Sequence, residues 1–106
     1  MNKDFLHITD FSAEEIQAIF DLTTRLKMET HKGKSHHLLR GKTLAMIFQK
    51  PSARTRVSFE TGMCQLGGYA LFLGPADVGL GKREAVKDLA QLFSRYNDLI
   101  MARVFD

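Results

Sequence analysis

Three short apolar segments constrain the fold of this chain more than any other feature. Thr43–Phe48 is almost continuously apolar and of strand length, and Tyr69–Leu73 and Leu99–Ala102 are similar. Strands that are apolar at nearly every position are typically covered by helices on both faces. Because helical patterns alternate with these segments, the sequence predicts an α/β fold: a parallel sheet with helices on both faces, joined by right-handed crossovers.

Three helices are expected around these strands. The first runs from Ser12 to Glu29, because Ser12 and Glu15 have capping-box spacing. Its apolar positions, Ile16, Ile19, Phe20 and Leu26, share one helical face. The second runs from Arg54 to Leu66, where Gly67-Gly68 provides a left-handed cap. The third runs from Glu84 to Tyr96, and the last strand ends at Arg103.

Size and composition indicate one ordered domain. A chain of 106 residues with 44% hydrophobic and 25% charged content can bury one modest core. Its single cysteine, Cys64, excludes an internal disulfide and favours a reducing compartment, and we interpret it as a packed helix residue. No apolar run approaches the ~18 residues of a membrane span, and the polar start is unlike a secretory signal. We therefore expect a cytoplasmic protein that does not bind membranes.

The basic connection between the first helix and the first strand raises the possibility of nucleic-acid binding. The chain has a net charge of +3, and residues 25–42 hold six Lys/Arg against one acid, Glu29. This segment lacks interleaved aromatic residues, so its phosphate contacts would be weak and salt-dependent, and no nucleic-acid partner is predicted. We interpret His31–Lys42 as an exposed connection, with His31, His36 and His37 solvated rather than bound to metal.

Ligands of parallel α/β sheets bind at the carboxyl ends of the strands. This rule indicates three segments: Gln49–Thr55, Gly74–Arg83, and the residues from Arg103 onward. All three contain polar or charged side chains, although we interpret Lys82 and Arg83 as solvated charges. The sequence therefore predicts a binding site where these segments meet.

The first of these segments has the composition of an anion site. Residues 49–56 read Gln-Lys-Pro-Ser-Ala-Arg-Thr-Arg and lead from a buried strand into a helix. A helix N-terminus presents free N–H groups and the positive end of the helix dipole, and both attract phosphate. Ser52 and Thr55 can add hydroxyl donors, and Arg54 can add a planar fork that matches phosphate. Ser52 can equally serve as an ordinary helix N-cap.

Two further arginines have competing interpretations. Arg56 precedes Glu60 by four residues, so we interpret it as half of a surface ion pair. Arg103 is an isolated charge in an apolar stretch, which requires either a ligand or a salt bridge to an acid elsewhere. Walker, Gly-x-Gly-x-x-Gly, Gly-x-Ser-x-Gly and His-Glu-x-x-His motifs are absent, so nucleotide and metal sites are not predicted.

Ser52-Ala53-Arg54-Thr55-Arg56 resembles the Ser-Thr-Arg-Thr-Arg signature of the aspartate and ornithine carbamoyltransferases. The flanking Phe-Gln-Lys-Pro and Val-Ser-Phe-Glu fit as well, and the similarity extends over essentially the whole chain through Ala102-Arg103-Val104. The resemblance implies that residues 1–106 form a carbamoyl-phosphate-binding domain. It implies no metal and no organic cofactor.

The resemblance also implies roles for individual residues. Ser52, Arg54 and Thr55, with the backbone at Ala53, would hold the phosphate, while Thr55 and Arg103 would face the carbamoyl oxygen. In the family's reaction an amine attacks the carbamoyl carbon and phosphate leaves. Donors fixed at the carbonyl oxygen and the departing phosphate would supply most of the catalysis, so Arg54, Thr55 and Arg103 are the expected catalytic residues.

Two positions depart from the family pattern. Ala53 replaces a usual threonine, which removes a hydroxyl but retains the backbone N–H. Gly79 stands where the ornithine branch commonly has a glutamine. The loss of the threonine hydroxyl at position 53 would lower phosphate affinity without harming the fold.

The second substrate is expected to be L-ornithine, because Lys50 before Pro51 and the segment from Leu71 to Glu84 look like the ornithine branch. Aspartate, acetylated or succinylated ornithine, and putrescine remain alternatives, as does a non-catalytic interaction fragment. The sequence ends at Asp106, before the family's His-Pro-x-Gln element and second-substrate domain. We therefore expect an incomplete domain that is inactive alone and belongs to a longer, homotrimeric enzyme.

Overall fold

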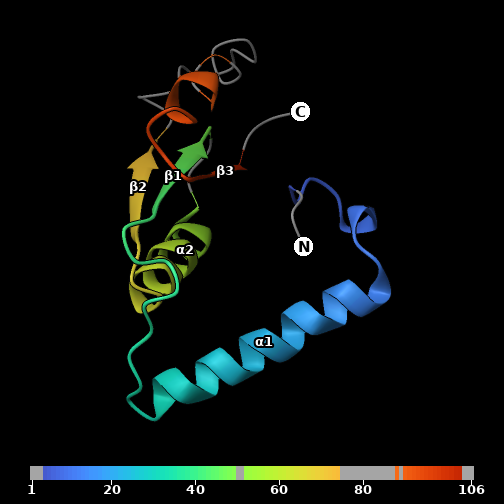
Figure 1. Ribbon diagram of the computed structural model, residues 1–106. Helices are drawn as coiled ribbons and strands as arrows, with labels where there is room; N and C mark the ends of the chain where they lie inside the picture. The colour runs from blue at the N-terminus through green and yellow to red at the C-terminus, as the bar shows by residue number, and fades with distance from the viewer. Residues whose placement is uncertain (1–3, 50–51, 75–87, 89, 104–106) are drawn as a thin grey trace. The chain divides into compact units, whose positions relative to one another are not determined.

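The structure is a computed structural model that describes residues 4–49, 52–74, 88 and 90–103 (Figure 1). The chain divides into two compact units, Met1–Ser35 and His36–Asp106. Five residues that the sequence-based predictions mention lie outside the described part: Lys50, Pro51, Gly79, Lys82 and Arg83.

The first unit consists of a short 3₁₀ helix, η1 (Ile8–Asp10), and the long helix α1 (Ala13–His31). The predicted capping box is confirmed: the Glu15 N–H donates to Ser12 Oγ at 3.1 Å, and the Ser12 N–H donates to Glu15 Oε1 at 2.8 Å. These reciprocal bonds satisfy two groups at the helix start and fix where α1 begins. The helix ends two residues later than expected, at His31 instead of Glu29, and η1 was not predicted.

The second unit contains the predicted parallel sheet. Its strands are β1 (Thr43–Phe48), β2 (Tyr69–Leu73) and β3 (Leu99–Arg103), in the order β2-β1-β3. Both strand pairs are parallel. The central strand is buried from Leu44 to Phe48, as its apolar sequence requires, whereas both outer strands are partly exposed.

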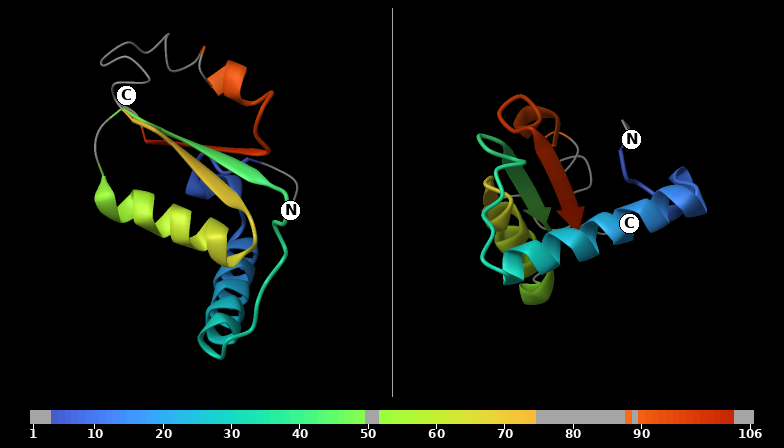
Figure 2. Two further views of the ribbon diagram at one scale, coloured as in Figure 1. Left: turned by 90° about the vertical axis from the view of Figure 1, so that its left-hand side faces the viewer. Right: turned by 60° about the horizontal axis from the view of Figure 1, so that its bottom comes forward.

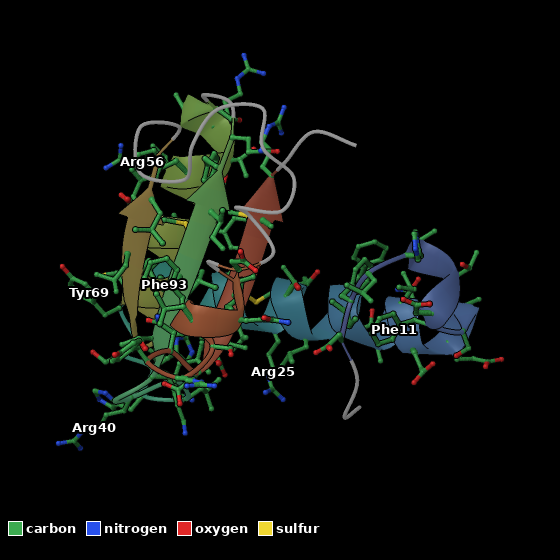
Figure 3. The ribbon with its side chains drawn as sticks, turned by 90° about the horizontal axis from the view of Figure 1, so that it is seen from above. Phe11, Arg25, Arg40, Arg56, Tyr69 and Phe93 are labelled. Atoms are coloured by element: carbon green, nitrogen blue, oxygen red, sulfur yellow. The ribbon has the colours of Figure 1, made fainter. Side chains whose placement is uncertain are left out.

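Helices lie on the two faces of this sheet. On one face, α2 (Ala53–Gln65) contributes Met63 to a core cluster with Leu44, Met46 and Phe48. On the opposite face lie the helical residues 90–93, including Phe93 (Figures 2 and 3). Residues 88 and 90–93 agree with the third predicted helix, but residues 94–96, which were also expected to be helical, form a turn. Residues 84–87 and 89 lie outside the described part.

The end of α2 confirms the predicted glycine cap. Gly67 has φ +90°, and its N–H donates to the Cys64 carbonyl at 3.0 Å. The Gly68 N–H donates to the Met63 carbonyl at 2.7 Å. Together these bonds form a Schellman motif, which satisfies two of the carbonyls at the helix end.

Two expectations for this region were wrong. His36 was expected to be solvated, but only 8% of it is exposed, because the segment before β1 packs against the end of α2. The Leu39 N–H donates to the Leu66 carbonyl at 2.8 Å, and a Cβ on Gly67 would lie only 3.1 Å from the His36 carbonyl oxygen. Cys64 was expected to be packed but is exposed, because it lies on the outward side of α2.

Candidate anion site at the carboxyl ends of the strands

The loop after β1 and the end of β3 lie side by side at the carboxyl edge of the sheet. Phe48, the last residue of β1, is in register with Arg103, the last residue of β3. One residue further on, the Gln49 N–H donates to the Arg103 carbonyl oxygen at 2.9 Å, and Gln49 is 3% exposed. The backbone therefore fixes Arg103 next to the start of the predicted anion loop.

Ser52 is the N-cap residue of α2, but its hydroxyl does not cap the helix. Its carbonyl accepts the first helical bond, from the Arg56 N–H at 3.0 Å. The N–H groups of residues 53–55 precede that bond and so have no acceptor within the helix. The first turn of α2 thus keeps the donors that an anion requires.

Thr55 connects the first turn of α2 with β3. The Ser52 hydroxyl donates to Thr55 Oγ1 at 2.9 Å, and Arg103 Nη1 donates to the same oxygen at 3.4 Å, which is a long hydrogen bond. The three residues, which were predicted to share one site, therefore lie together in the structure. Within the described residues, the Arg103 guanidinium contacts Thr55 rather than a carboxylate, so the salt-bridge alternative finds no support there.

Arg54 is exposed on the first turn of α2. Its carbonyl accepts from the Ser58 hydroxyl at 2.8 Å, while its guanidinium has no partner among the described residues. A guanidinium that is free in the protein can reach a ligand without first breaking an ion pair.

Arg56 makes the predicted surface ion pair, with Nε 2.9 Å from Glu60 Oε1. Its guanidinium carbon also lies 3.9 Å from the centroid of the Phe72 ring, on β2. This contact could not be predicted from the sequence, because it depends on which residue of β2 faces α2 in the folded sheet. Figure 3 shows Arg56 near the carboxyl end of β2.

An open depression lies beside the first turn of α2. It is lined by Ser52, Ala53, Arg56, Val57, Glu60 and Phe72. The small side chain of Ala53 therefore borders open space, so a larger residue could be accommodated there.

The charges and donors of this site suit an anion and not a cation. Arg54 and Arg56 lie on the first turn of α2 and Arg103 lies at the end of β3; among the described residues, the ion pair that these arginines make is that of Arg56 with Glu60. Among the described residues, no three His, Cys, Asp or Glu side chains are grouped closely enough to hold a metal ion. The same part of the chain has no helix that is long and apolar enough to cross a membrane. Fixed hydroxyl, amide and guanidinium donors can bind a phosphate and stabilise negative charge that develops next to it.

Comparison with known proteins supports the relationship that the loop suggests. Residues 3–106 match the family described as aspartate/ornithine carbamoyltransferase, carbamoyl-P binding domain. Ornithine carbamoyltransferase from Syntrophotalea carbinolica is 53% identical over 105 residues, which cover 99% of this chain and 35% of that protein. The chloroplastic ornithine carbamoyltransferase of Pisum sativum is 54% identical over 104 residues, which cover 97% of this chain and 28% of that protein.

Solved structures show the same relationship. Ornithine carbamoyltransferase from Pyrococcus furiosus superposes with a TM-score of 0.89 at 53% identity, over 98% of this chain and 33% of that one. The catalytic subunit of M. jannaschii aspartate transcarbamoylase gives a TM-score of 0.84 at 34% identity, over 95% of this chain and 33% of that one. The chain thus spans about a third of the length of these relatives. Its match over nearly every residue shows that the chain belongs to the aspartate/ornithine carbamoyltransferase family.

Proposed function

We propose that this chain supplies the carbamoyl-phosphate-binding part of an ornithine carbamoyltransferase. The observation that carries the proposal is the meeting of Ser52, Thr55 and Arg103 at the free N-terminus of α2. A phosphate group needs several hydrogen-bond donors on one side, and a carbonyl oxygen beside it needs one or two more. The first turn of α2 and the end of β3 together offer donors for both groups.

The phosphate would be held by the first turn of α2. The N–H groups of residues 53–55, the Ser52 hydroxyl and the Arg54 guanidinium all donate hydrogen bonds, and the helix dipole favours the negative charge. Binding would require the Ser52 hydroxyl to turn from Thr55 Oγ1 to a phosphate oxygen, because one hydroxyl proton serves one acceptor well.

The carbamoyl oxygen would lie between Thr55 and Arg103. When the ornithine side-chain amine attacks the carbamoyl carbon, negative charge builds on this oxygen and then passes to the departing phosphate. Donors already fixed at both places stabilise that charge without reorganising, which is the largest contribution expected from the protein. Holding carbamoyl phosphate in one orientation supplies the rest. We propose Arg54, Thr55 and Arg103 as the catalytic residues.

The remaining features of the proposal concern the whole protein. The amine-binding part would lie outside this chain, so the chain alone would bind carbamoyl phosphate but not transfer its carbamoyl group. The whole enzyme would be a cytoplasmic homotrimer with active sites between subunits. It would use no metal or organic cofactor.

Ornithine is favoured over aspartate because the three ornithine carbamoyltransferases compared above are 53–54% identical to the chain, against 34% for the M. jannaschii aspartate enzyme. The test is an assay of the full-length protein with carbamoyl phosphate and a panel of amines. The panel holds L-ornithine, L-aspartate, N-acetylornithine, N-succinylornithine and putrescine. We expect citrulline from ornithine and little product from the others.

Preference for another amine would reassign the second substrate but leave the phosphate site intact. No product from any amine, although the protein is folded and trimeric, would favour the non-catalytic alternative. Ala53 and Gly79 would then be the first residues to revert toward the family pattern.

A further inference from the structure

Arg56 does more in this structure than pair with Glu60. Its Nε lies 2.9 Å from Glu60 Oε1 on the next turn of α2, and its guanidinium carbon lies 3.9 Å from the centre of the Phe72 ring. The first contact stays within the helix, whereas the second crosses from α2 to β2. Arg56 directly follows Thr55, so this cross-contact starts one residue from the anion site.

Phe72 extends the connection into the core. Its ring centre lies 5.3 Å from that of Phe48 at an angle of 49°, and Phe48 is completely buried. Tilted aromatic pairs at this separation are favourable and directional. The stack of Arg56, Phe72 and Phe48, which we call the Arg56 stack, therefore joins the first turns of α2 to the last residue of β1.

The far end of the Arg56 stack reaches the other half of the proposed site. Phe48 is in register with Arg103, and the adjacent Gln49 N–H donates to the Arg103 carbonyl at 2.9 Å. The phosphate donors are on α2, while the carbamoyl-oxygen donor Arg103 is on β3. A fixed distance between them is what catalysis by orientation requires.

We infer that Arg56 is a positioning residue: through Phe72 it sets the orientation of the first turn of α2 relative to Arg103. Arg56 acts through the stacking of its planar guanidinium on the ring, with Glu60 holding the guanidinium in place, and not through attraction of its charge for the phosphate. The inference rests on the proposed function for its catalytic meaning, but the contact itself can be tested without any substrate.

Two substitutions distinguish an effect of charge on phosphate binding from an effect of the position of α2. Arg56→Lys keeps the charge but loses the planar group that stacks on an aromatic face. Glu60→Gln makes the surroundings of the anion site more positive, so an effect of charge alone would tighten phosphate binding. If Arg56 positions the helix, both substitutions should weaken phosphate binding, because each releases the guanidinium from Phe72.

The experiment compares wild type with Arg56→Lys, Arg56→Gln, Glu60→Gln and Phe72→Leu. Asp98→Asn is the matched control. It removes one negative charge, as Glu60→Gln does, but lies beside Lys42 and Thr43 at the amino ends of β1 and β3. Three measurements are made on the full-length protein: the amide NMR signals of residues 53–55 without ligand, the Kd for inorganic phosphate by calorimetry, and the steady-state kinetics with carbamoyl phosphate.

We expect the amide signals of residues 53–55 to shift in all four test variants and not in Asp98→Asn. The Kd for phosphate should rise by about threefold or more, the size expected for a half-exposed cation–aromatic contact. In steady-state assays, kcat should fall together with the affinity for carbamoyl phosphate, because Arg103 and the phosphate donors lose their alignment. A defect in folding alone would lower the active fraction without moving these amide signals.

Several outcomes would overturn the inference. The inference is wrong if Arg56→Lys has the amide signals and the phosphate Kd of wild type, or if Glu60→Gln binds phosphate more tightly than wild type. It is also wrong if the amide signals of residues 53–55 do not shift in Arg56→Gln. If the amide signals move but wild type itself binds no phosphate, the positioning contact stands and the proposed function fails. The two failures are therefore distinguishable.

Discussion

At the residue scale, the site is organised around one oxygen atom, Thr55 Oγ1. It accepts hydrogen bonds from the Ser52 hydroxyl and from Arg103 Nη1, so it joins the phosphate side of the site to the carbonyl side. Because two donors already point at this oxygen, the hydroxyl proton of Thr55 is directed away from both of them. A ligand oxygen on that side of Thr55 would accept a hydrogen bond from this hydroxyl.

Replacing Thr55 with valine tests this junction. Valine keeps the branched shape and removes the hydroxyl, so kcat/KM of the full-length enzyme should fall by about a hundredfold, as for loss of one fixed donor. The control is Thr55→Ser, which keeps the hydroxyl and should retain most activity. Equal activities of the valine and serine variants would show that the Thr55 hydroxyl takes no part.

Ala53 provides a gain-of-affinity prediction. Because Ala53 borders an open depression, a threonine fits there, and its hydroxyl would add a donor at the first helical position. Ala53→Thr should lower the Kd for carbamoyl phosphate by about tenfold, the value of one hydrogen bond to a charged group. Calorimetry would measure it, with Ala53→Val as a control of the same shape. Tightening by both variants alike would mean that packing, and not the hydroxyl, is responsible.

At the element scale, local sequence patterns predicted the main elements of the second unit. The helical spacing from Arg54 to Leu66 predicted α2, and the apolar segments predicted the strands of the sheet. The capping box of α1 and the glycine cap of α2 depend on residues three to five positions apart, and both were confirmed. The burial of His36 and the contact of Arg56 with Phe72 depend on how separate elements pack. No local pattern contains that information, so the sequence could not predict them.

The glycine cap of α2 gives a stability prediction. Gly67 has φ +90°, and a Cβ there would lie 3.1 Å from the His36 carbonyl oxygen and 3.2 Å from His37 Cα. Gly67→Ala should therefore lower the free energy of unfolding by about 1–3 kcal/mol, through strain and crowding together. Urea unfolding would measure it.

The matched control for that substitution is Gly62→Ala, in the interior of the same helix. A Cβ at Gly62 would meet no atom within 4 Å, so alanine should raise the free energy of unfolding by up to about 1 kcal/mol. Opposite signs for the two variants would separate cap geometry from helix propensity. Destabilisation by both to the same extent would contradict the assignment of Gly67 as the cap.

At the scale of the whole molecule, the outer strands leave apolar side chains exposed. Tyr69 is 63% exposed and Leu71 42% on β2, and Leu99 is 45% exposed on β3. Unpaired strand edges with apolar surface promote association.

We therefore expect the 106-residue chain on its own to associate in sedimentation velocity experiments. Leu71→Lys should reduce the association, because a charged residue on an outer strand opposes edge pairing. A monodisperse monomer that unfolds cooperatively would contradict this prediction.

The central claim is that the first turn of α2 binds the phosphate of carbamoyl phosphate. The most direct test is calorimetric titration of the full-length protein with carbamoyl phosphate, comparing wild type with Arg54→Ala and using inorganic phosphate as a competitor. We predict saturable binding by wild type, competition by phosphate, and no measurable binding by a folded Arg54→Ala variant. Equal binding by both proteins, or none by folded wild type, would contradict the account.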